Sequence, residues 1–409
     1  MSHFPFARPG REHGFSIVEL MVSVVIAMLA LMFATRMVTG GERTKQTALA
    51  GSDSMQNGML AMFSLSNDAT QAGFGLNDPI VAGCDTTMND SLGYTLMPAA
   101  PASAVHPLAP VIIENNGTAP DRITFYSGSG LGGTASMRVV DSFTGGALLG
   151  IAANPYGFSS GSDLAQPDVI LVAPESGTGK CSLAQVSAAV PGIAATNTNP
   201  GLRIDSNADT RFNANGLGGN SYIGNQARIF NLGPADKLSF HTWSVQNGFL
   251  ALRATDMPAS TASAGSAGAT VADNIVSIKA QYGFDIRTGA AFTPEKGMVV
   301  GQWSNSMIDA DGTGGAGSPG DYQRVVAVRI AVVARSKAPE RPTTGTACDA
   351  TAVAPTLFSN AQPQNVAAVP VNVNLAVTGD LVDWKCYHYR VFDTIVPIRN
   401  NAWRPTAWP

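Results

Sequence analysis

The chain has 409 residues, of which 45% are apolar and only 13% are charged, and its formal net charge is −4. Soluble domains usually carry about a quarter of charged residues, so this composition is charge-poor, and its 43 glycines favour strands and loops over helices. The sequence has no long basic run beyond its N-terminus, so no nucleic-acid partner is expected.

The first element in chain order is an apolar stretch from Phe15 to Thr35, in which Glu19 is the only charged residue. As a helix this stretch would be about 31 Å long, which matches the hydrocarbon core of a bilayer. A secretory signal has a shorter apolar region, of about 7–15 residues, before its cleavage site. We therefore predict a single membrane span over residues 15–36, preceded by a short polar leader over residues 1–14.

Glu19 places a carboxylate inside this apolar stretch, where an unpaired charge is costly. One interpretation is that the side chain extends to the membrane interface, as an ordinary charge near a helix end does. The other is that Glu19 pairs with a cation from a neighbouring subunit. A buried ion pair of that kind specifies register more reliably than it adds stability.

The junction between the leader and the apolar stretch has an ordered set of residues: Gly14, Phe15, Ser16, Ile17, Val18, Glu19 and Leu20. This order resembles the class III, prepilin-type leader. The resemblance implies that a dedicated peptidase cuts between Gly14 and Phe15 and methylates the new amine of Phe15. It also implies that Glu19 pairs with this amine in a neighbouring subunit and sets the assembly register.

The helical pattern continues from Met37 to Gly73 without a proline, which predicts an amphipathic half of the helix over residues 37–74. Its apolar stripe consists of Ala48, Met55, Met59, Met62, Phe63 and Ala69. We expect this stripe to pack into the core of the chain's own globular domain. The glycines at 40, 41 and 51 indicate either a bend or close packing, and the helix should end near Gly73.

After Pro79 the helical period disappears, and several segments alternate apolar and polar residues with period two, which predicts strands. These segments are residues 121–125, 169–172, 237–254, 274–286, 322–336 and 386–399. Asn247-Gly248 predicts a type I′ hairpin inside the third segment. The alternation also places Val276 on the same face as Ile278, and Val326 on the same face as Val328.

The predicted fold class is α+β, with the long N-terminal helix packed on an antiparallel or mixed β-sheet domain over residues 75–409. Long loops rich in Gly, Ser, Ala and Asn are expected on its surface. They cover residues 191–220, 259–270 and 311–320.

The four cysteines, Cys84, Cys181, Cys348 and Cys386, form no C-x-x-C pair, so zinc and redox chemistry are poorly supported. An even number in a chain that looks exported favours two disulfides over four free thiols. Four cysteines allow three pairings, and the sequence does not choose between them. We favour Cys84–Cys181 and Cys348–Cys386.

Further segments extend the resemblance beyond the leader: SMQNGMLAMFSLSNDATQAGF, QYGFD, RVVAVRIAVVARS and YHYRVFDTIVPIRNN. They are similar to the PilW family of type IV pilus minor pilins, in which a stem helix precedes a sheet that closes on a strand like Tyr389–Phe392. The resemblance covers residues 14–74 and 273–401. Residues 80–270 match poorly, and their role is unassigned.

The resemblance implies a pilin-like fold and a structural role, without enzymatic activity or a required cofactor. Such a protein is held in the inner membrane by one span, with a periplasmic domain, until it enters the tip or priming complex of a surface pilus. The implied partners are other minor pilins, the major pilin, the peptidase, the assembly platform and possible tip adhesins. The alternatives are a type II secretion pseudopilin, which shares the leader, and a membrane-tethered ligand- or DNA-binding module.

One pattern is compatible with an ion site. Asp309 and Asp311 alternate before Gly312, and such a turn can wrap calcium. The EF-hand pattern is incomplete, because no further ligands follow at the required spacing. Calcium binding at Asp309 and Asp311 and a solvated loop are therefore both expectations at this point. No motif for hydrolysis or nucleotide binding is complete in the sequence.

Overall fold

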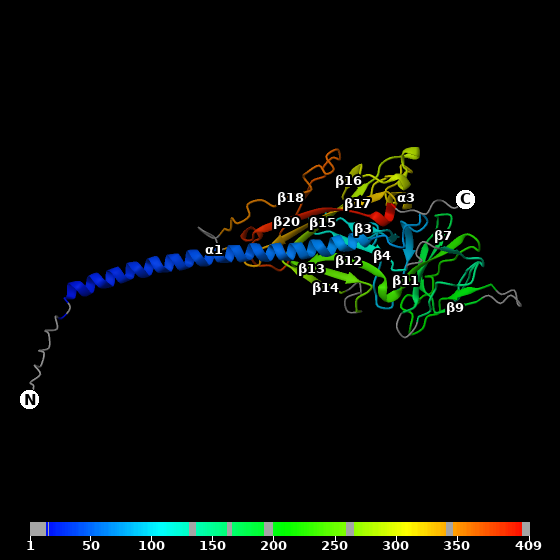
Figure 1. Cartoon of the computed structure of the whole chain (residues 1–409), viewed down its shortest axis with the longest axis horizontal. Helices are drawn as coiled ribbons and strands as arrows, with labels where there is room; N and C mark the ends of the chain where they lie inside the picture. The colour runs from blue at the N-terminus through cyan, green and yellow to red at the C-terminus, as the bar shows by residue number, and fades with distance from the viewer. Residues whose placement is uncertain are drawn as a thin grey trace, which may run out of the picture. The chain divides into compact units, whose positions relative to one another are not determined.

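The computed structural model describes residues 14, 16–130, 136–161, 166–191, 199–258, 266–340 and 347–402. The chain divides into two compact units, Met1–Ser52 and Asp53–Pro409. Helix α1, Ile17–Gln71, begins in the first unit and ends in the second, and all described strands belong to the second unit. Figure 1 shows α1 in blue and the strands that follow it in cyan to red. The predicted α+β class, with a long N-terminal helix, is confirmed.

Helix α1 continues without interruption through the glycines at 40, 41 and 51. It ends because Gly73 adopts a left-handed conformation with φ +83°, which a glycine adopts at little cost. The Gly73 amide then donates to the carbonyl of Tyr126 at 2.8 Å instead of continuing the helix. The predicted end of the helix near Gly73 is therefore confirmed.

A six-stranded sheet occupies the middle of the chain. Its strands are β1 (Cys84–Thr87), β2 (Pro107–Leu108), β5 (Ser136–Arg138), β7 (Asp168–Pro174), β8 (Cys181–Gln185) and β11 (Ala227–Pro234). Their order is β2-β1-β8-β7-β11-β5, and within the described chain β1 and β8 pair in parallel while the other pairs are antiparallel. The mixed character expected for the sheet domain is present here.

A three-stranded sheet lies in the same part of the sequence. It consists of β6 (Leu148–Gly150), β9 (Ala188–Val190) and β10 (Gly201–Arg203), in the order β6-β10-β9. The expectation of a surface loop over residues 191–220 is wrong for its described part, because β10 lies within it and Phe212 and Leu217 are buried. A strand of three residues and isolated apolar residues are too short to show a hydrophobic period in the sequence.

The five-stranded sheet contains the predicted hairpin. Its strands are β3 (Val111–Glu114), β4 (Arg122–Ser127), β12 (Ser239–Gln246), β13 (Phe249–Ala254) and β14 (Ala269–Asp273), in the antiparallel order β14-β13-β12-β4-β3. Gln246 pairs with Phe249, and Asn247 and Gly248 have φ of +51° and +83°. Both positive values fit a type I′ turn, so the hairpin is confirmed.

The four-stranded sheet is formed by β15 (Ile275–Phe284), β16 (Gln302–Ser304), β17 (Val325–Arg335) and β20 (Tyr389–Pro397), in the order β16-β15-β17-β20. The predicted assignment of side chains to the two faces of this sheet is wrong near the first residues of β15 and of β17. A register shift between Ile275 and Ser277 moves Val276 to the face opposite Ile278. A second shift near Phe284 places Val325 rather than Val326 beside Val328.

Both faces of β15 and β17 are buried, because the segment between β17 and β20 folds over the face that α1 leaves open. This segment carries β18 (Thr356–Leu357) and β19 (Val371–Asn372), and its Leu357 and Phe358 pack against Val276, Ala331 and Val333. The remaining described helices are short. They are η2 (Ala235–Lys237), η3 (Gly289–Ala291), η4 (Pro294–Lys296), α3 (Pro319–Tyr322), η5 (Trp384–Cys386) and α4 (Arg399–Ala402).

The end of α1 packs on the sheets through small residues. Ala61, Leu65, Ala69 and Ala72 are fully buried in a core shared with the five-stranded and four-stranded sheets. Gly58 lies against the Phe392 ring of β20 so closely that a Cβ atom there would overlap the ring. Small side chains thus let the helix axis approach the strands.

The expected packing of the methionine stripe is wrong for most of its large members. Met55, Met59 and Phe63 are exposed, with 71% of Phe63 accessible, while Met62 is partly buried and Ala69 is fully buried. Periodicity located an apolar stripe correctly, but the buried face is the neighbouring one, which contains Gly58, Ala61, Ala69 and the larger Leu65. Most side chains on this face are small, so the helix approaches the sheet closely, and Leu65 is a larger side chain that the contact also buries.

Candidate functional site

The predicted processing site lies where α1 begins. Gly14 and Ser16 are exposed, and Phe15 lies outside the described residues. The Ser16 carbonyl accepts the first helical hydrogen bond, from the Leu20 amide at 3.0 Å. Glu19 stands in the first turn, where a carboxylate is favoured by the partial positive charge of the helix N-terminus.

The segment Ile17–Val38 of α1 is long and apolar enough to cross a membrane, judged by length and composition alone. None of its side chains is buried, and its Val, Leu, Ile, Met and Phe residues are exposed around the whole helix. Such a surface is stable only when lipid or other apolar helices cover it.

In the second unit, a polar cluster fastens α1 to the five-stranded sheet. Asp68 of α1 accepts hydrogen bonds from His241 Nδ1 at 2.8 Å and from Trp243 Nε1 at 2.7 Å, both on β12. His241 Nε2 faces Asp256, which follows β13, at 3.1 Å. We call these four residues the His241 clamp. Its members are separated by up to 188 positions and follow no motif, so the cluster is not predictable from the sequence pattern.

The charges of the His241 clamp are matched. Burial alone would lower the pKa of His241, but the hydrogen bonds and charges of Asp256 and Asp68 outweigh it and raise this pKa to about 9. The same contact with His241 lowers the pKa of Asp256, against the opposite effect of burial. At neutral pH an imidazolium therefore lies between two carboxylates, and both ring nitrogens donate.

A second buried ion pair joins two sheets. Lys279 on β15 pairs with Asp121, just before β4, and both side chains are almost fully buried. Lys279 Nζ also donates to the carbonyl of Ala119 at 2.9 Å, and the Ala280 amide donates to Asp121 at 3.1 Å. Because every partner is supplied from inside the fold, this pair is a structural contact rather than a site for a ligand.

The structure contains two disulfides, Cys84–Cys181 and Cys348–Cys386, which is the pairing that we favoured. The first lies where β1 pairs with β8, in the six-stranded sheet. The second closes the segment that covers the outer face of β17. The first therefore joins two strands of one sheet, and the second links a residue outside the strands to the short helix η5.

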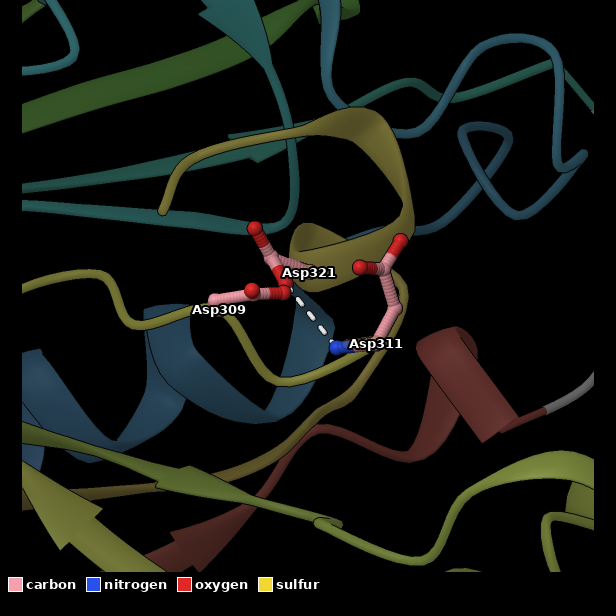
Figure 2. Close-up of side chains that lie close together, drawn as sticks. All are labelled: Asp309, Asp311 and Asp321. Carbon is pink, nitrogen blue, oxygen red and sulfur yellow. Dashed lines mark hydrogen bonds between the residues drawn. The ribbon is translucent and has the colours of Figure 1, made fainter. Parts of the chain in front are cut away.

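The structure adds a third carboxylate to the predicted ion site. Asp321 of α3 lies near Asp309 and Asp311, and one oxygen of each lies within 4.8 Å of the others (Figure 2). Asp321 already accepts four backbone hydrogen bonds, from the amides of residues 310, 311, 317 and 318. Its carboxylate belongs to a capping box with Ser318, which the Ser-Pro-Gly-Asp pattern signals in the sequence.

The other two carboxylates also hold the turn. Asp309 accepts the amides of Thr313 and Gly314, each at 3.1 Å. Burial alone would raise the pKa of Asp311, but hydrogen bonds from Thr313 and Ser318 outweigh it and lower this pKa below its usual value. Backbone amides thus account for this acidic loop, and calcium binding at Asp309 and Asp311 stays a prediction for calorimetric titration. If adding calcium produces no binding heat and no thermal shift, calcium binding at this loop is excluded.

Comparison with known proteins identifies two families. Residues 244–400 match the family of the type IV pilus-assembly protein W, PilW, and residues 9–35 match the prokaryotic N-terminal methylation motif. The first match runs from β12 to the segment after β20, and the second includes the leader junction and most of the apolar span. Both resemblances drawn from the sequence are confirmed.

One solved structure that matches part of the chain is a type IV-like pilin from Thermus thermophilus, TTHA1219. It has 12% sequence identity, the match covers 41% of this chain and 70% of that chain, and the TM-score is 0.18. A TM-score this low does not establish a common fold. No curated protein matches the chain in sequence.

Proposed function

Because residues 244–400 match the PilW family and residues 9–35 match the N-terminal methylation motif, we propose that the chain is a minor pilin of the tip or priming complex of a type IV pilus. In this role the chain is a structural subunit, and catalysis is performed on it by the prepilin peptidase. The observation that carries the proposal is one continuous helix. It joins a methylation motif and an exposed apolar span directly to the PilW-type sheet domain.

The leader junction supplies the chemistry of assembly. Cleavage after Gly14 creates a new amine on Phe15, four residues before Glu19 in the same apolar region. In a bundle of stems, Glu19 of one subunit pairs with the Phe15 amine of the next. This neutralises a carboxylate that is otherwise costly in an apolar environment, and it defines the axial register.

The exposed stripe of Met55, Met59 and Phe63 supports contacts with neighbouring subunits. It continues on α1 after the apolar span, and it is not used by the chain's own core. Flexible methionine side chains adapt to different partner surfaces. We assign the stems of the major pilin and of other minor pilins as its occupants, since they present the same apolar chemistry.

The location of the protein follows from the same features. The span Ile17–Val38 anchors the chain once in the inner membrane, with the sheet domain in the periplasm, where both disulfides are compatible with an oxidising environment. The assembly platform then moves the subunit into a fibre at the cell surface.

The decisive experiment measures the N-terminus of the protein from isolated membranes and from sheared pili by intact-mass spectrometry. The expected mature chain begins at methylated Phe15. Gly14→Val should leave an uncleaved precursor that is absent from pili, whereas the leader control Gly10→Ala should be processed normally. A full-length chain that starts at Met1 in functional filaments would contradict the proposal.

The register role of Glu19 is tested separately. Glu19→Ala should still be cut and methylated, but its amount in sheared pili should fall at least about tenfold, as expected for loss of one buried ion-pair partner. Glu19→Asp, which keeps the charge, should restore part of the incorporation. Unchanged incorporation of Glu19→Ala would remove the register role and leave the leader assignment intact.

A further inference from the structure

The five-stranded sheet carries a polar cavity on the face away from α1. Trp243 of β12 faces the helix and bonds to Asp68, while Thr242 and Ser244, its neighbours in the strand, face the other way. The cavity on that other face has a volume of about 320 Å³. This volume lies at the lower end of the range typical of small-molecule sites, about 300–1,000 Å³.

Two arginines reach this cavity from opposite sides of β12. Arg253 is on β13 and pairs with Thr242, and Arg122 is on β4, one residue before Ile123, which pairs with Trp243. Their Cα atoms are two strand spacings apart, about 10 Å across the sheet. Side chains of this length can therefore contact one small ligand between them.

Arg253 is the cation with unused donors. Its guanidinium lies 4.9 Å from the centre of the Tyr94 ring, and its Nη2 atom donates only a long hydrogen bond, 3.5 Å, to the carbonyl of Thr95. Among the described residues it forms no ion pair with a carboxylate. The contact with the Tyr94 ring positions the guanidinium, and most of its N–H groups have no partner among the described residues.

The other charges at the cavity are already matched. Arg122 pairs with Glu114 at 2.9 Å, and Asp121 pairs with the buried Lys279. The cavity therefore has a net charge of about +1, from Arg253, and offers no free carboxylate to a cationic ligand. Its remaining lining is rich in hydroxyl and amide groups. These are Asn116, Thr242, Ser244 and Gln246.

Thr242, which lines the cavity, is held by hydrogen bonds to two buried hydroxyl groups. The hydroxyl of Tyr94 lies 3.0 Å from that of Thr242, which lies 2.9 Å from that of Thr124 on β4. These three buried groups satisfy one another, so the residues beneath a ligand need no rearrangement when it binds. A positioned cation beside a hydrogen-bonded polar lining is the arrangement that a specific polar site requires.

We propose that this cavity binds a small hydroxylated carboxylate, such as a six-carbon sugar acid, either free or at the end of an acidic polysaccharide. The carboxylate accepts hydrogen bonds from the Arg253 fork, and the ligand hydroxyls bond to Ser244, Gln246 and Asn116. A planar guanidinium binds a carboxylate in a bidentate manner, and the lack of a free acidic group selects against amino acids. The inference rests on this cavity alone and does not depend on the role in pilus assembly.

The test uses the full chain purified in detergent micelles and titrated calorimetrically with D-glucuronate. D-Glucose, which lacks the carboxylate, and acetate, which lacks the hydroxylated ring, are the matched probes. We expect saturable binding of glucuronate with a Kd of about 1 mM or lower, and at least about tenfold weaker binding of each probe. Equal binding of glucuronate and acetate, or no saturation by glucuronate, would overturn the proposal.

Variants separate the site from the fold. Arg253→Gln should weaken glucuronate binding at least about tenfold, as expected for loss of a charge-assisted pair, and Arg122→Gln should weaken it less. The control Arg138→Gln, on the six-stranded sheet and paired with Glu175, should leave binding unchanged. Ser244→Leu fills the cavity without altering charge and should abolish binding with unchanged thermal unfolding. Normal binding by Arg253→Gln and Ser244→Leu would refute the site.

A second titration tests whether the cavity binds a free sugar acid or the end of an acidic polysaccharide. Alginate oligomers, which are chains of sugar acids, are compared with free glucuronate in the same titration. A lower Kd per chain end for the oligomer assigns the cavity to the end of a polysaccharide, and equal values assign it to the free sugar acid. Both results support the proposed chemistry, whereas failure of both probes contradicts it.

Discussion

The segment Ile17–Val38 exposes large apolar side chains on all faces of α1, whereas the end of the same helix, from Asp53 to Gln71, buries one face made mostly of small residues. In the first segment, bulk and hydrophobicity serve contacts outside the chain. In the second segment, small side chains allow close packing on the strands, and the large apolar residues face outward. Hydrophobicity alone therefore does not identify the core-facing side of this helix, because most of its large apolar residues are exposed while small residues and Leu65 are buried.

The largest expected effect on stability comes from replacing leucine by alanine in the second segment, with the same replacement in the first segment as its control. Leu65→Ala removes a fully buried side chain and should lower the free energy of unfolding of the second unit by about 2–5 kcal/mol. Leu29→Ala, at a position that is 52% exposed, should leave it unchanged within about 0.5 kcal/mol. Urea unfolding in detergent, followed by tryptophan fluorescence, measures both. Similar losses in the two variants would mean that the two segments do not differ as described.

The His241 clamp should make the stability of the second unit depend on pH. The pKa of His241 in the folded chain is about 9, above its usual 6.5, so the charged form is stabilised by folding. This contribution is fully present below about pH 6.5 and is lost as the pH rises through about 9. The loss should be on the order of 3 kcal/mol, measured as the decrease in unfolding free energy.

The matched variants for the clamp are His241→Gln and His388→Gln. His241→Gln should be less stable at neutral pH and should show a nearly flat stability profile between pH 6.5 and 9. His388 pairs with Glu340 on the surface, with about half of each side chain exposed, so its replacement should leave the slope unchanged. A steep slope that persists in His241→Gln would assign the dependence to other groups.

A smaller effect is expected from adding a methyl group at two helix glycines. At Gly58 the new Cβ overlaps the Phe392 ring, and Gly58→Ala should destabilise the second unit by about 1–3 kcal/mol despite the better helix propensity of alanine. At Gly41 nothing lies within 4 Å of the added atom. Gly41→Ala should therefore not destabilise the chain. Thermal unfolding of both variants tests whether close approach to β20 is what Gly58 provides.

The smallest effect on stability is expected at the exposed stripe. Phe63→Ser should change the unfolding free energy by less than about 0.5 kcal/mol, because the side chain is 71% exposed. It should nevertheless reduce the amount of the protein in sheared pili. Thr70→Ala, an exposed position on the same helix, is the control. Normal incorporation of Phe63→Ser would exclude this stripe as a subunit contact.

Several local features of the fold were predictable from the sequence. The hairpin at Asn247-Gly248 depends on two positive φ values that this dipeptide adopts readily, and the helix end at Gly73 depends on one. The strand period located β12, β13, β15, β17 and β20. The faces failed where single-residue shifts occur, at Ile275 and near Phe284, because a bulge is set by packing and leaves no periodic trace.

The candidate sites divide in the same way. Gly14, Phe15 and Glu19 form a continuous motif, so their proposed roles follow from local order in the chain. Asp321 completes the acidic loop as a cap, and its spacing from Ser318 is a capping-box signature that the sequence carries. The His241 clamp and the cavity at Arg253 contain residues from distant strands, and no spacing rule predicts them.

The sequence by itself predicted the apolar span, the α+β class and the resemblances to the methylation motif and to the PilW family, since each depends on residues close together in the chain or on composition. Only the tertiary structure decided which face of α1 is buried, which carboxylates hold His241 and which two arginines share a cavity. These contacts depend on strand order and register, which bring together residues more than 100 positions apart, such as Arg122 and Arg253. Local periodicity specifies the direction of a side chain relative to its own element, and packing alone selects its partner.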